Sequence, residues 1–355
     1  MPDIDLLKQL SEAIGVSGDE AAVRKIIINE IKDHVTDMHI DAVGNLTAFK
    51  KGTGERNLRV MIAAHMDEVG FMVMGHDSNG LIKFANVGGV DERILPALRL
   101  KVGPDQIPGV ILWTPIHHSK DQNVVKQSNL RIDIGVTSKS AAENKAKLGT
   151  RIAFDSEFKE IGQDVLRGKS FDDRAGCAIL IELLRGGPYP VDIVAAFTVQ
   201  EEIGLRGARV AAQRLNPDVA IVLEGTTAHD VPLADADPDE PNTPNPACKQ
   251  GFGPALTVMD RSIIVPPHLL NFVRQLGDEQ GIAYQLKTAL GGGNDGGSIH
   301  LSNAGVPAIV MSIPCRYIHA PRAQMRREDY DSTLQLAQAT LAAITPQIVQ
   351  GEPVR

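Results

Sequence analysis

The sequence predicts an α/β protein with a mixed central sheet, helices on both faces and a small β-rich insertion. Apolar strands alternate with amphipathic helices over most of the second half of the chain, and this alternation is typical of a parallel or mixed sheet covered on both sides. Two helical patterns and an apolar strand precede the insertion. The insertion itself contains short alternating runs broken by Gly, Pro and Asn, which is the pattern of a small β module.

The N-terminal elements follow from apolar spacing. Two helices are predicted where apolar residues recur at helical spacing: Leu6, Leu7, Leu10 and Ile14 in the first, and Val23, Ile26, Ile27 and Ile31 in the second. The stretch NLRVMIAAH at residues 57–65 is a predicted buried strand that ends in polar residues. Alternating runs such as FMVMGH, LIKFANV and LRIDIGV then occupy the insertion, with one helix expected at SKSAAENKAKLG.

The α/β pattern resumes near residue 170. In chain order we predict a helix at DDRAGCAILIELLRG, a strand at VDIVAAFTV, a helix at GARVAAQRL and a strand at VAIVLEG. A helix at PPHLLNFVRQLGDEQ, strands at AYQLKTA and PAIVMSIP, and a helix from about Asp331 to Val349 follow. We therefore predict one α/β domain made of residues 1–68 and 166–355, interrupted by a β-rich insertion of residues 69–165.

Length and composition exclude several classes of protein. The 355 residues are 43% apolar and 23% charged, which is enough for a sizeable core. The formal net charge of −8 argues against binding to nucleic acid, which requires a basic surface. No apolar run approaches the roughly 18 residues of a membrane span. The three scattered cysteines indicate neither a disulfide framework nor a thiolate metal site. Because the acidic, amphipathic start also differs from a secretory signal, we expect a cytoplasmic protein.

Two glycine-rich segments resemble nucleotide-binding motifs without matching them. GQDVLRGKS at residues 162–170 has five residues between its glycines, whereas the P-loop has four. GGGNDGG at residues 291–297 fits the dinucleotide pattern, but the acid expected about 20 residues later is missing before Glu328. Neither segment therefore predicts a nucleotide site.

Acidic residues and histidines gather where the predicted core strands end. AAHMDEVG at residues 63–70, QEEIGLRG at 200–207, VLEGTTAHD at 222–230 and MSIPCRYIHAP at 311–321 each include or follow a strand end. GKSFDDRAGC at residues 168–177 leads into a helix, where Asp is also an ordinary N-cap. Because open α/β sheets carry their sites at strand ends, we expect these clusters to meet.

The residue types in these clusters indicate a metal site. Histidine and carboxylate ligands without cysteine suit zinc, cobalt or manganese, and more acids than one metal requires indicate two ions bridged by a carboxylate. The adjacent Glu201 and Glu202 repel each other unless cations lie nearby. If these two residues continue an extended strand, they point to opposite sides, so we expect them to have different roles. His65 and Asp67 face one side of a strand end, so Asp67 can orient the imidazole.

With these motifs in place, the chain resembles the tetrahedral aminopeptidases. This family of co-catalytic metallopeptidases includes glutamyl and deblocking aminopeptidases and relatives labelled as cellulases. The resemblance covers nearly the whole chain and rests on AHMDEVG, FDDRAG, QEEIGLRGA and RYIHAP in this order. It implies an aminopeptidase for peptides with a free N-terminus and two divalent metal ions per subunit, with zinc or cobalt ahead of manganese. It also implies dimers, joined through the insertion, that assemble into a tetrahedral dodecamer.

The resemblance also implies residue roles. Five residues would bind the metals: His65 and His319 one ion each, Asp172 as the bridge, and Glu202 and Glu224 as terminal ligands. Glu201 would be the general base, Asp67 would orient His65, and the GGGNDGG loop would flank the site. The family often has Asp where this chain has Glu224, so the preferred metal stays open.

An acidic loop is a second departure from the family pattern. Residues 229–251 carry five acids and five prolines and are too polar to pack, so they predict a long surface loop. The loop follows Glu224 closely, and its charges are expected to disfavour acidic peptides at the site entrance.

Three other functions stay open. A deacylase or carboxypeptidase of the same clan would use a similar ligand set, and a panel of aminoacyl, N-acyl-aminoacyl and C-terminal substrates separates these activities. A metal-independent glycoside hydrolase would use two carboxylates roughly 5–10 Å apart and would resist chelators. A non-catalytic assembly or binding protein would neither bind metal nor turn over peptides.

Overall fold

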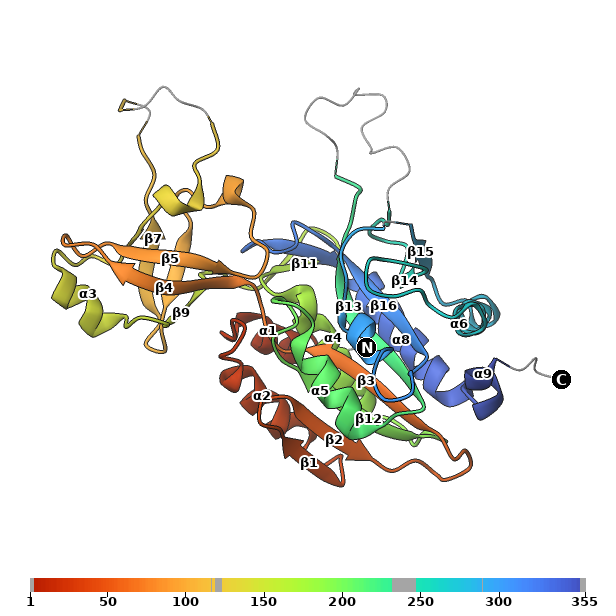
Figure 1. Cartoon of the computed structure of the whole chain (residues 1–355). Coiled ribbons are helices and arrows are strands. Elements are labelled where there is room, and N and C mark those ends of the chain that lie inside the picture. The colour runs from red at the N-terminus through yellow and green to blue at the C-terminus, as the bar shows by residue number, and fades with distance from the viewer. Residues whose placement is uncertain (1–2, 116, 119–122, 232–246, 289, 352–355) are drawn as a thin grey trace, which may run out of the picture.

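The centre of the molecule is a large mixed β-sheet (Figure 1). The computed structural model describes residues 3–115, 117–118, 123–231, 247–288 and 290–351, and in this part of the chain the sheet has 11 strands. Its main path is, in spatial order, β1 (Asp37–Ile40), β2 (Leu46–Lys50), β12 (Asp192–Thr198), β3 (Arg59–His65), β13 (Val219–Thr227), β16 (Ala308–Arg316), β17 (Ala323–Arg326), β11 (Val165–Gly168) and β10 (Lys159–Ile161). Two further strands, β14 (Ala255–Thr257) and β15 (Gln285–Lys287), join it beside β16. β3 is parallel to β12 and β13, whereas β2 is antiparallel to β12, which confirms the predicted mixed α/β fold.

Helices cover both faces of this sheet because its crossovers run in opposite directions. From β3 the chain passes through α4 (Phe171–Arg185) to β12, and from β12 it passes through α5 (Arg206–Leu215) back across β3 to β13. Right-handed crossovers in opposite directions place their helices on opposite faces. α1 (Ile4–Glu12), α2 (Ala21–Ile31) and α8 (Arg327–Ala343) pack with α4, while α7 (Asp295–Ile299) packs with α5. α6 (Pro267–Gln280) contacts α8 and α9 (Pro346–Gln350).

The central strands form the core because both of their faces are covered. β3 and β13 are nearly continuous apolar runs, and residues such as Ile62, Ile221 and Val222 are fully buried between the two helical layers. Each such side chain contributes roughly 1.5–3 kcal/mol of burial free energy. The polar residues at the ends of these strands are therefore held by rigid, buried backbone.

A closed six-stranded barrel interrupts the crossover between β3 and α4 (Figure 1). It consists of β4 (Gly70–His76), β5 (Ile82–Val87), β8 (Ile132–Asp133), β7 (Ile107–Ile111), β6 (Arg99–Val102) and β9 (Arg151–Phe154). Phe71 packs edge-to-face on Phe84 and Phe154, with ring centroids 5.2 and 5.6 Å apart, so the barrel has a core of its own. α3 (Lys139–Lys145) begins at the N-cap Ser138, whose hydroxyl accepts from Ala141 N–H. Two short 3-10 helices, Glu92–Ile94 and Gln127–Asn129, complete this part of the chain.

Several elements lie where no prediction was made. The hairpin of β1 and β2 extends the sheet beside β12, and β17 follows β16 through the turn that carries His319. β10 belongs to the predicted insertion but pairs with β11 in the large sheet, so the barrel strands end at Phe154. These strands are only three to five residues long, which is too short for a clear alternation.

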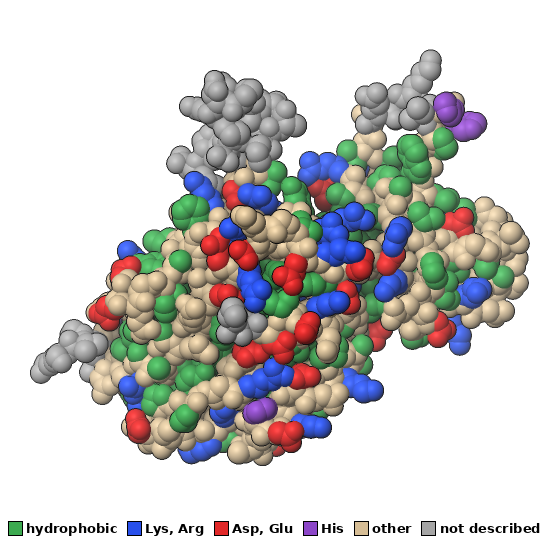
Figure 2. Space-filling view, turned by 180° about the vertical axis from the view of Figure 1, so that it is seen from behind, with side chains coloured by type: hydrophobic (Ala, Val, Ile, Leu, Met, Phe, Trp, Pro, Cys, Tyr) green, Lys and Arg blue, Asp and Glu red, His purple; other side chains and the backbone are tan. Residues whose placement is uncertain are grey.

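The surface carries both signs of charge. Figure 2 shows one face on which Lys and Arg side chains are interspersed with Asp and Glu, so the described residues of that face form no broad basic surface of the kind that nucleic acid requires. None of the helices in the described ranges has the length and apolar character needed to cross a membrane.

Candidate metal centre

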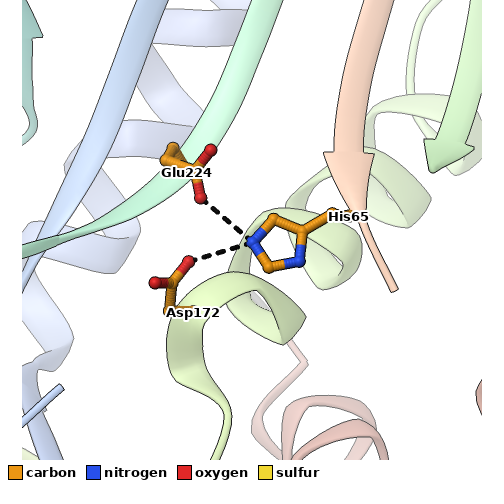
Figure 3. Close-up of side chains that lie close together, drawn as sticks. All are labelled: His65, Asp172 and Glu224. Atoms are coloured by element: carbon orange, nitrogen blue, oxygen red, sulfur yellow. Dashed lines mark hydrogen bonds and ion pairs between the residues drawn. The ribbon is translucent and has the colours of Figure 1, made fainter. Parts of the chain in front are cut away.

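Three residues from distant parts of the chain meet at the carboxyl ends of the central strands (Figure 3). His65 is the last residue of β3, Asp172 lies at the start of α4, and Glu224 belongs to β13. His65 Nε2 lies 3.1 Å from Asp172 Oδ1 and 3.2 Å from Glu224 Oε1. The close approach of β13 to α4 depends on Gly225, because a Cβ at that position would lie only 2.7 Å from Asp172 Cβ.

A second group of three residues shares Asp172 with the first. His319 Nε2 lies 3.3 Å from Asp172 Oδ2 and 3.3 Å from Glu202 Oε1. In each group the candidate ligand atoms lie within 4.8 Å of one another. Asp172 therefore presents one carboxylate oxygen to each histidine, which is the arrangement that a bridging ligand requires.

The histidines are oriented by backbone carbonyls. His65 Nδ1 donates to the carbonyl oxygen of Asp67 at 3.1 Å, and His319 Nδ1 donates to that of Gly89 at 2.8 Å. A carbonyl oxygen can only accept, so each Nδ1 carries the proton and each Nε2 faces the carboxylates as a free ligand atom. Gly89 lies in the turn after β5, so the barrel supplies the acceptor that orients His319.

Asp67 has a different set of contacts from those expected. Its carboxylate lies 3.5 Å from His65 Nδ1, whereas its own carbonyl takes the shorter contact to that nitrogen. The carboxylate accepts from the backbone N–H groups of Glu201 and Glu202 at 3.0 and 3.2 Å and from the Ser17 hydroxyl at 2.6 Å. Asp67 therefore fixes the turn that carries both glutamates, in addition to lying beside His65.

Glu201 and Glu202 occupy a turn rather than an extended strand. β12 ends at Thr198, and Gln200 has a left-handed φ of 58° that reverses the chain, so the expected strand alternation at these two residues is wrong. The two side chains nevertheless diverge, because Glu201 Oε2 lies 3.9 Å from His65 Nε2 while Glu202 Oε1 contacts His319. Glu201 is not a member of either group of candidate ligands.

Burial of so many acids shifts their protonation. Burial raises the pKa of Glu201 and of Glu224 well above the ordinary glutamate value, and it also raises the pKa of Glu202. Burial alone would lower the pKa of His65, but the neighbouring carboxylates of Glu224, Asp172 and Asp67 raise it well above its usual value. In the same way, the neighbouring carboxylates of Asp172 and Glu202 outweigh burial and raise the pKa of His319 to about 11. The cluster therefore holds positive charge, as protons or as other cations.

Unpartnered oxygens indicate that the cations are metal ions. Oε1 of Glu202 and Oε2 of Glu224 are buried and accept no hydrogen bond, although buried polar atoms are nearly always paired. Two imidazole nitrogens and three carboxylates without a thiolate form a ligand set suited to zinc, cobalt or manganese. The residues present therefore fit divalent metal ions.

Glu68 and Lys169 form a buried ion pair beside the candidate ligands, and the sequence patterns did not predict it. Lys169 Nζ lies 2.7 Å from both carboxylate oxygens of Glu68, and the Ser170 hydroxyl donates to the same carboxylate at 2.5 Å. Glu68 and Lys169 are each only 2% exposed, and Arg174 Nη2 lies 3.5 Å from Glu68. Glu68 follows His65 by three residues and Lys169 precedes Asp172 by three, so the pair ties the two ligand-bearing segments together.

Asp173 caps the helix, which is the ordinary role of an Asp that precedes a helix in the sequence. Its Oδ1 accepts from Gly176 N–H at 3.0 Å, and its Oδ2 accepts from the backbone N–H of His65 at 3.0 Å. The neighbouring Asp172 points toward the histidines instead. Of the two adjacent acids, one therefore begins the helix and the other belongs to the site.

A cavity of about 350 Å³ opens beside the two groups. Its walls include both groups' carboxylates, Glu201, the glycines of the GGGNDGG segment and Lys287 at the end of β15. The glycine-rich segment therefore flanks the site. Of the acidic loop, Asp230 forms an ion pair with Arg316 at 2.8 Å, whereas Asp235, Asp237, Asp239 and Glu240 lie outside the described residues.

Comparison with known proteins gives one consistent result. Residues 44–336 match the family model described as M42 glutamyl aminopeptidase. A putative aminopeptidase of Acetivibrio thermocellus is 36% identical over 338 residues, which cover 94% of this chain and 96% of that protein.

Solved structures agree in fold over nearly the full length of the chain. An aminopeptidase from the archaeon Desulfurococcus kamchatkensis is 33% identical with a TM-score of 0.90, covering 99% of this chain and 98% of its own. The TET1 peptidase of Pyrococcus horikoshii is 30% identical with a TM-score of 0.84, and the match covers 96% of this chain and 99% of that one. That peptidase is described as assembling into a tetrahedron or a large octahedral shell. A Thermotoga maritima protein named endoglucanase is 35% identical with a TM-score of 0.78, and the match covers 97% of this chain and 98% of that one.

Metal stabilisation should increase with pH. Groups with raised pKa values, such as Glu201, Glu224 and His319, stabilise the metal-free fold most below their unfolded pKa values and lose this contribution as pH rises. Metal ions replace the lost protons, and at low pH protons compete with them. The gain in Tm on adding zinc to chelator-treated protein should therefore grow between pH 5 and pH 8. The lowered pKa of Asp172 leaves that carboxylate charged throughout this range. A gain that is constant, or largest at pH 5, would contradict the assignment of this cluster as a metal centre.

Breaking the Glu68–Lys169 pair should destabilise the protein strongly. Glu68→Gln leaves the buried ammonium group of Lys169 without its carboxylate, which costs about 3–5 kcal/mol of unfolding free energy. Lys169→Met should cost less, because Arg174 Nη2 still lies 3.5 Å from Glu68. Lys159→Met is the matched control, because its pair with Glu157 is exposed and surface pairs contribute about 0–1 kcal/mol. Urea unfolding of the three single variants and of the Glu68→Gln/Lys169→Met double variant measures the coupling. Additive losses in the double variant would show that the two residues act independently.

Proposed function

The chain belongs to the M42 glutamyl aminopeptidase family, and on that premise we propose that it removes N-terminal residues from peptides with two divalent metal ions and a glutamate base. The aminopeptidase activity follows from the family and from relatives that are named aminopeptidases over nearly their whole length. The observation that carries the proposed two-metal mechanism is the sharing of Asp172 between two groups of candidate ligands.

Five residues would hold the metals. His65 and Glu224 would bind one ion, His319 and Glu202 the other, and Asp172 both, in keeping with the distances between these side chains. When bound, such ions lower the pKa of water and stabilise developing negative charge on a carbonyl oxygen. Zinc, cobalt and manganese all suit this ligand set.

Glu201 would move the proton. Its carboxylate reaches the cavity beside both groups without belonging to either, and it is held there by the hydrogen bond from its own N–H to Asp67. In this place Glu201 can accept a proton from the attacking water and deliver it to the leaving amine. Asp67 would act by positioning, because its contacts fix His65 and the turn of Glu201 and Glu202 together.

The cluster of carboxylates also suits the free amino terminus of a peptide substrate. A peptide with a free N-terminus carries a positive charge one residue away from the scissile bond, and a site rich in carboxylates favours that charge. An N-acylated peptide or a C-terminal carboxylate lacks this match. The same consideration favours an aminopeptidase over a deacylase or a carboxypeptidase.

The barrel would build the subunit contacts. It is a closed unit with its own core, and it exposes large apolar side chains at Val110, Trp113, Val124 and Val125. Exposed apolar side chains can belong to protein interfaces, and the P. horikoshii relative is described as assembling into a tetrahedron or a large octahedral shell. We expect dimers joined through the barrel and, from them, a dodecamer.

Reconstitution tests the activity. Metal-free protein should gain turnover of aminoacyl substrates on addition of zinc, cobalt or manganese, and strong chelators should abolish it. The same protein should leave N-acyl-aminoacyl substrates and cellulose oligomers intact. Chelator-resistant cleavage of a glycoside would instead support the glycoside hydrolase alternative.

The two adjacent glutamates should respond differently to the same substitution. Glu201→Gln keeps the shape of the side chain but cannot accept a proton, so turnover should fall roughly 10²- to 10⁴-fold while both metals stay bound. Glu202→Gln should lose metal first, and excess metal should restore part of its activity. Metal content and kcat of both variants decide the assignment. If Glu201→Gln loses its metal, or Glu202→Gln stays loaded and inactive, the two roles are reversed.

Assembly should depend on the barrel. Sedimentation should show an oligomer at working concentration, and Trp113→Glu should shift it toward smaller species because it places a charge in the exposed apolar surface. Ile40→Glu is the matched control, because Ile40 is also an exposed apolar residue but lies on β1, in the α/β domain. A fully active monomer would contradict the role assigned to the barrel.

A further inference from the structure

Asn45, which directly precedes β2, contacts the loop that carries Glu201 and Glu202. This loop joins β12 to α5, and the hydrogen bond from Gly207 N–H to the Val199 carbonyl closes it at 3.0 Å. Asn45 Oδ1 accepts from Val199 N–H at 3.0 Å, and Asn45 Nδ2 donates to the Gly207 carbonyl at 2.9 Å. One side chain therefore holds both ends of the loop.

The amide group of Asn45 fits its partners in only one orientation. Val199 N–H can only donate, so it faces Oδ1, whereas the Gly207 carbonyl and the Asp41 carboxylate can only accept, so they face Nδ2. Nδ2 also donates to Asp41 Oδ2 at 2.7 Å, and both of its hydrogens are thus used. Gly207 packs directly against the amide, because a Cβ at that position would lie 2.3 Å from Asn45 Oδ1. An aspartate in place of Asn45 would therefore turn an oxygen toward both acceptors.

The order of the strands explains why Asn45 and Asp67 contact the same loop. β12 lies between β2 and β3 in the sheet, with β2 antiparallel and β3 parallel to it, so the start of β2 and the end of β3 lie beside the end of β12. Asn45 directly precedes β2, and Asp67 follows β3 by two residues. Asp67 accepts from the N–H groups of Glu201 and Glu202 in the middle of the loop, whereas Asn45 holds its ends. The loop is therefore fixed from both neighbouring strands.

Asn45 acts at a distance from substrate and metal. Its side chain is fully buried, and it does not belong to the lining of the cavity at the metal centre. Any effect of Asn45 on the reaction therefore passes through the loop.

We propose that Asn45 is a positioning residue, which holds the loop so that Glu201 and Glu202 face the two groups of candidate ligands. This inference rests on the proposed function. Glu202 belongs to the group of His319, whereas the group of His65 takes no residue from the loop. Loss of the contact should therefore weaken the binding of one metal ion and slow proton transfer by Glu201, and it should leave the other ion in place.

Asn45→Asp is the variant that tests the proposal. A carboxylate keeps the size of the side chain and the acceptor for Val199 N–H, but it repels the Gly207 carbonyl. Calorimetric titration of metal-free protein with zinc should show the affinity for one ion falling roughly 10- to 100-fold, the usual scale for loss of a contact behind a metal ligand, with the affinity for the other ion unchanged. At saturating zinc, kcat for the best aminoacyl nitroanilide should fall by up to about 100-fold with little change in KM.

A double variant separates the loop from the hairpin of β1 and β2. Asn45→Asp also brings two carboxylates together, because Asp41 Oδ2 lies 2.7 Å from Nδ2, so it lowers stability for a reason unrelated to the loop. Asp41→Asn/Asn45→Asp exchanges the two groups and restores a donor–acceptor pair. Oδ1 at position 41 still accepts from the N–H groups of Val43, Gly44 and residue 45, and only the donor to the Gly207 carbonyl stays missing. The double variant should therefore regain Tm without regaining kcat or zinc affinity.

Thr47→Val is the matched control in the same hairpin. Thr47 is 4% exposed, and its hydroxyl donates to the His39 carbonyl at 3.3 Å. The variant therefore removes one buried hydrogen bond from the hairpin without touching the loop. It should lower Tm and leave kcat and both zinc affinities unchanged.

Three results would overturn the inference: an Asn45→Asp variant that behaves like Thr47→Val, equal weakening of both zinc ions, or recovery of kcat and zinc affinity in the double variant. If Asn45→Asp alone does not fold, the double variant supplies the same two measurements, and wild-type kcat and zinc affinity in it would contradict the role of Asn45. A wild-type protein that binds no zinc, or that turns over no aminoacyl substrate, would instead overturn the proposed function.

Discussion

Repulsion among buried carboxylates is the constraint on which the rest of this structure depends. Asp172, Glu201, Glu202 and Glu224 line one cavity with two histidines, and in a medium of low dielectric constant such charges cannot all remain ionised alone. One carboxylate oxygen of Glu202 and one of Glu224 accept no hydrogen bond, and the two histidines are fewer than the acids. On the proposed function, cations from outside neutralise these acids. Stability and chemistry would then draw on the same cations.

Holding the acids in place requires contacts between segments far apart in the chain. His65 and Asp172 are separated by the whole barrel, yet Glu68 and Lys169 pair directly behind them. Asp67 connects the end of β3 to the turn of Glu201 and Glu202 and to Ser17 near the N-terminus. The parallel strands bring the candidate ligands to one edge, and these buried polar contacts hold the segments that carry them against one another. Preorganisation of this kind would limit the rearrangement needed if metals bind as proposed.

Much of this arrangement could be predicted from the sequence, and the exceptions have physical reasons. Long apolar strands such as β3 and β13 and the acidic or histidine-containing motifs at their ends are local patterns, so the fold class and the meeting of the motifs were predictable. The turn at Glu201 was missed because it depends on the left-handed Gln200 and on the Asp67 acceptor, neither of which periodicity reveals. Glu68 and Lys169 were missed because each is an unremarkable charged residue in sequence. Their significance lies in which partners they gain or lack after folding.

The hydrogen bond from His319 to the Gly89 carbonyl has a consequence for how such an enzyme can evolve. The barrel looks like a detachable module, with its own core and only two covalent connections to the sheet, but one of its loops completes the orientation of a residue at the metal centre. Gly88 in the same loop has a left-handed φ of 84°, and a Cβ there would lie 3.3 Å from Glu202 Cβ, so the contact is tight as well as polar. A descendant that discarded the barrel would have to rebuild that acceptor elsewhere.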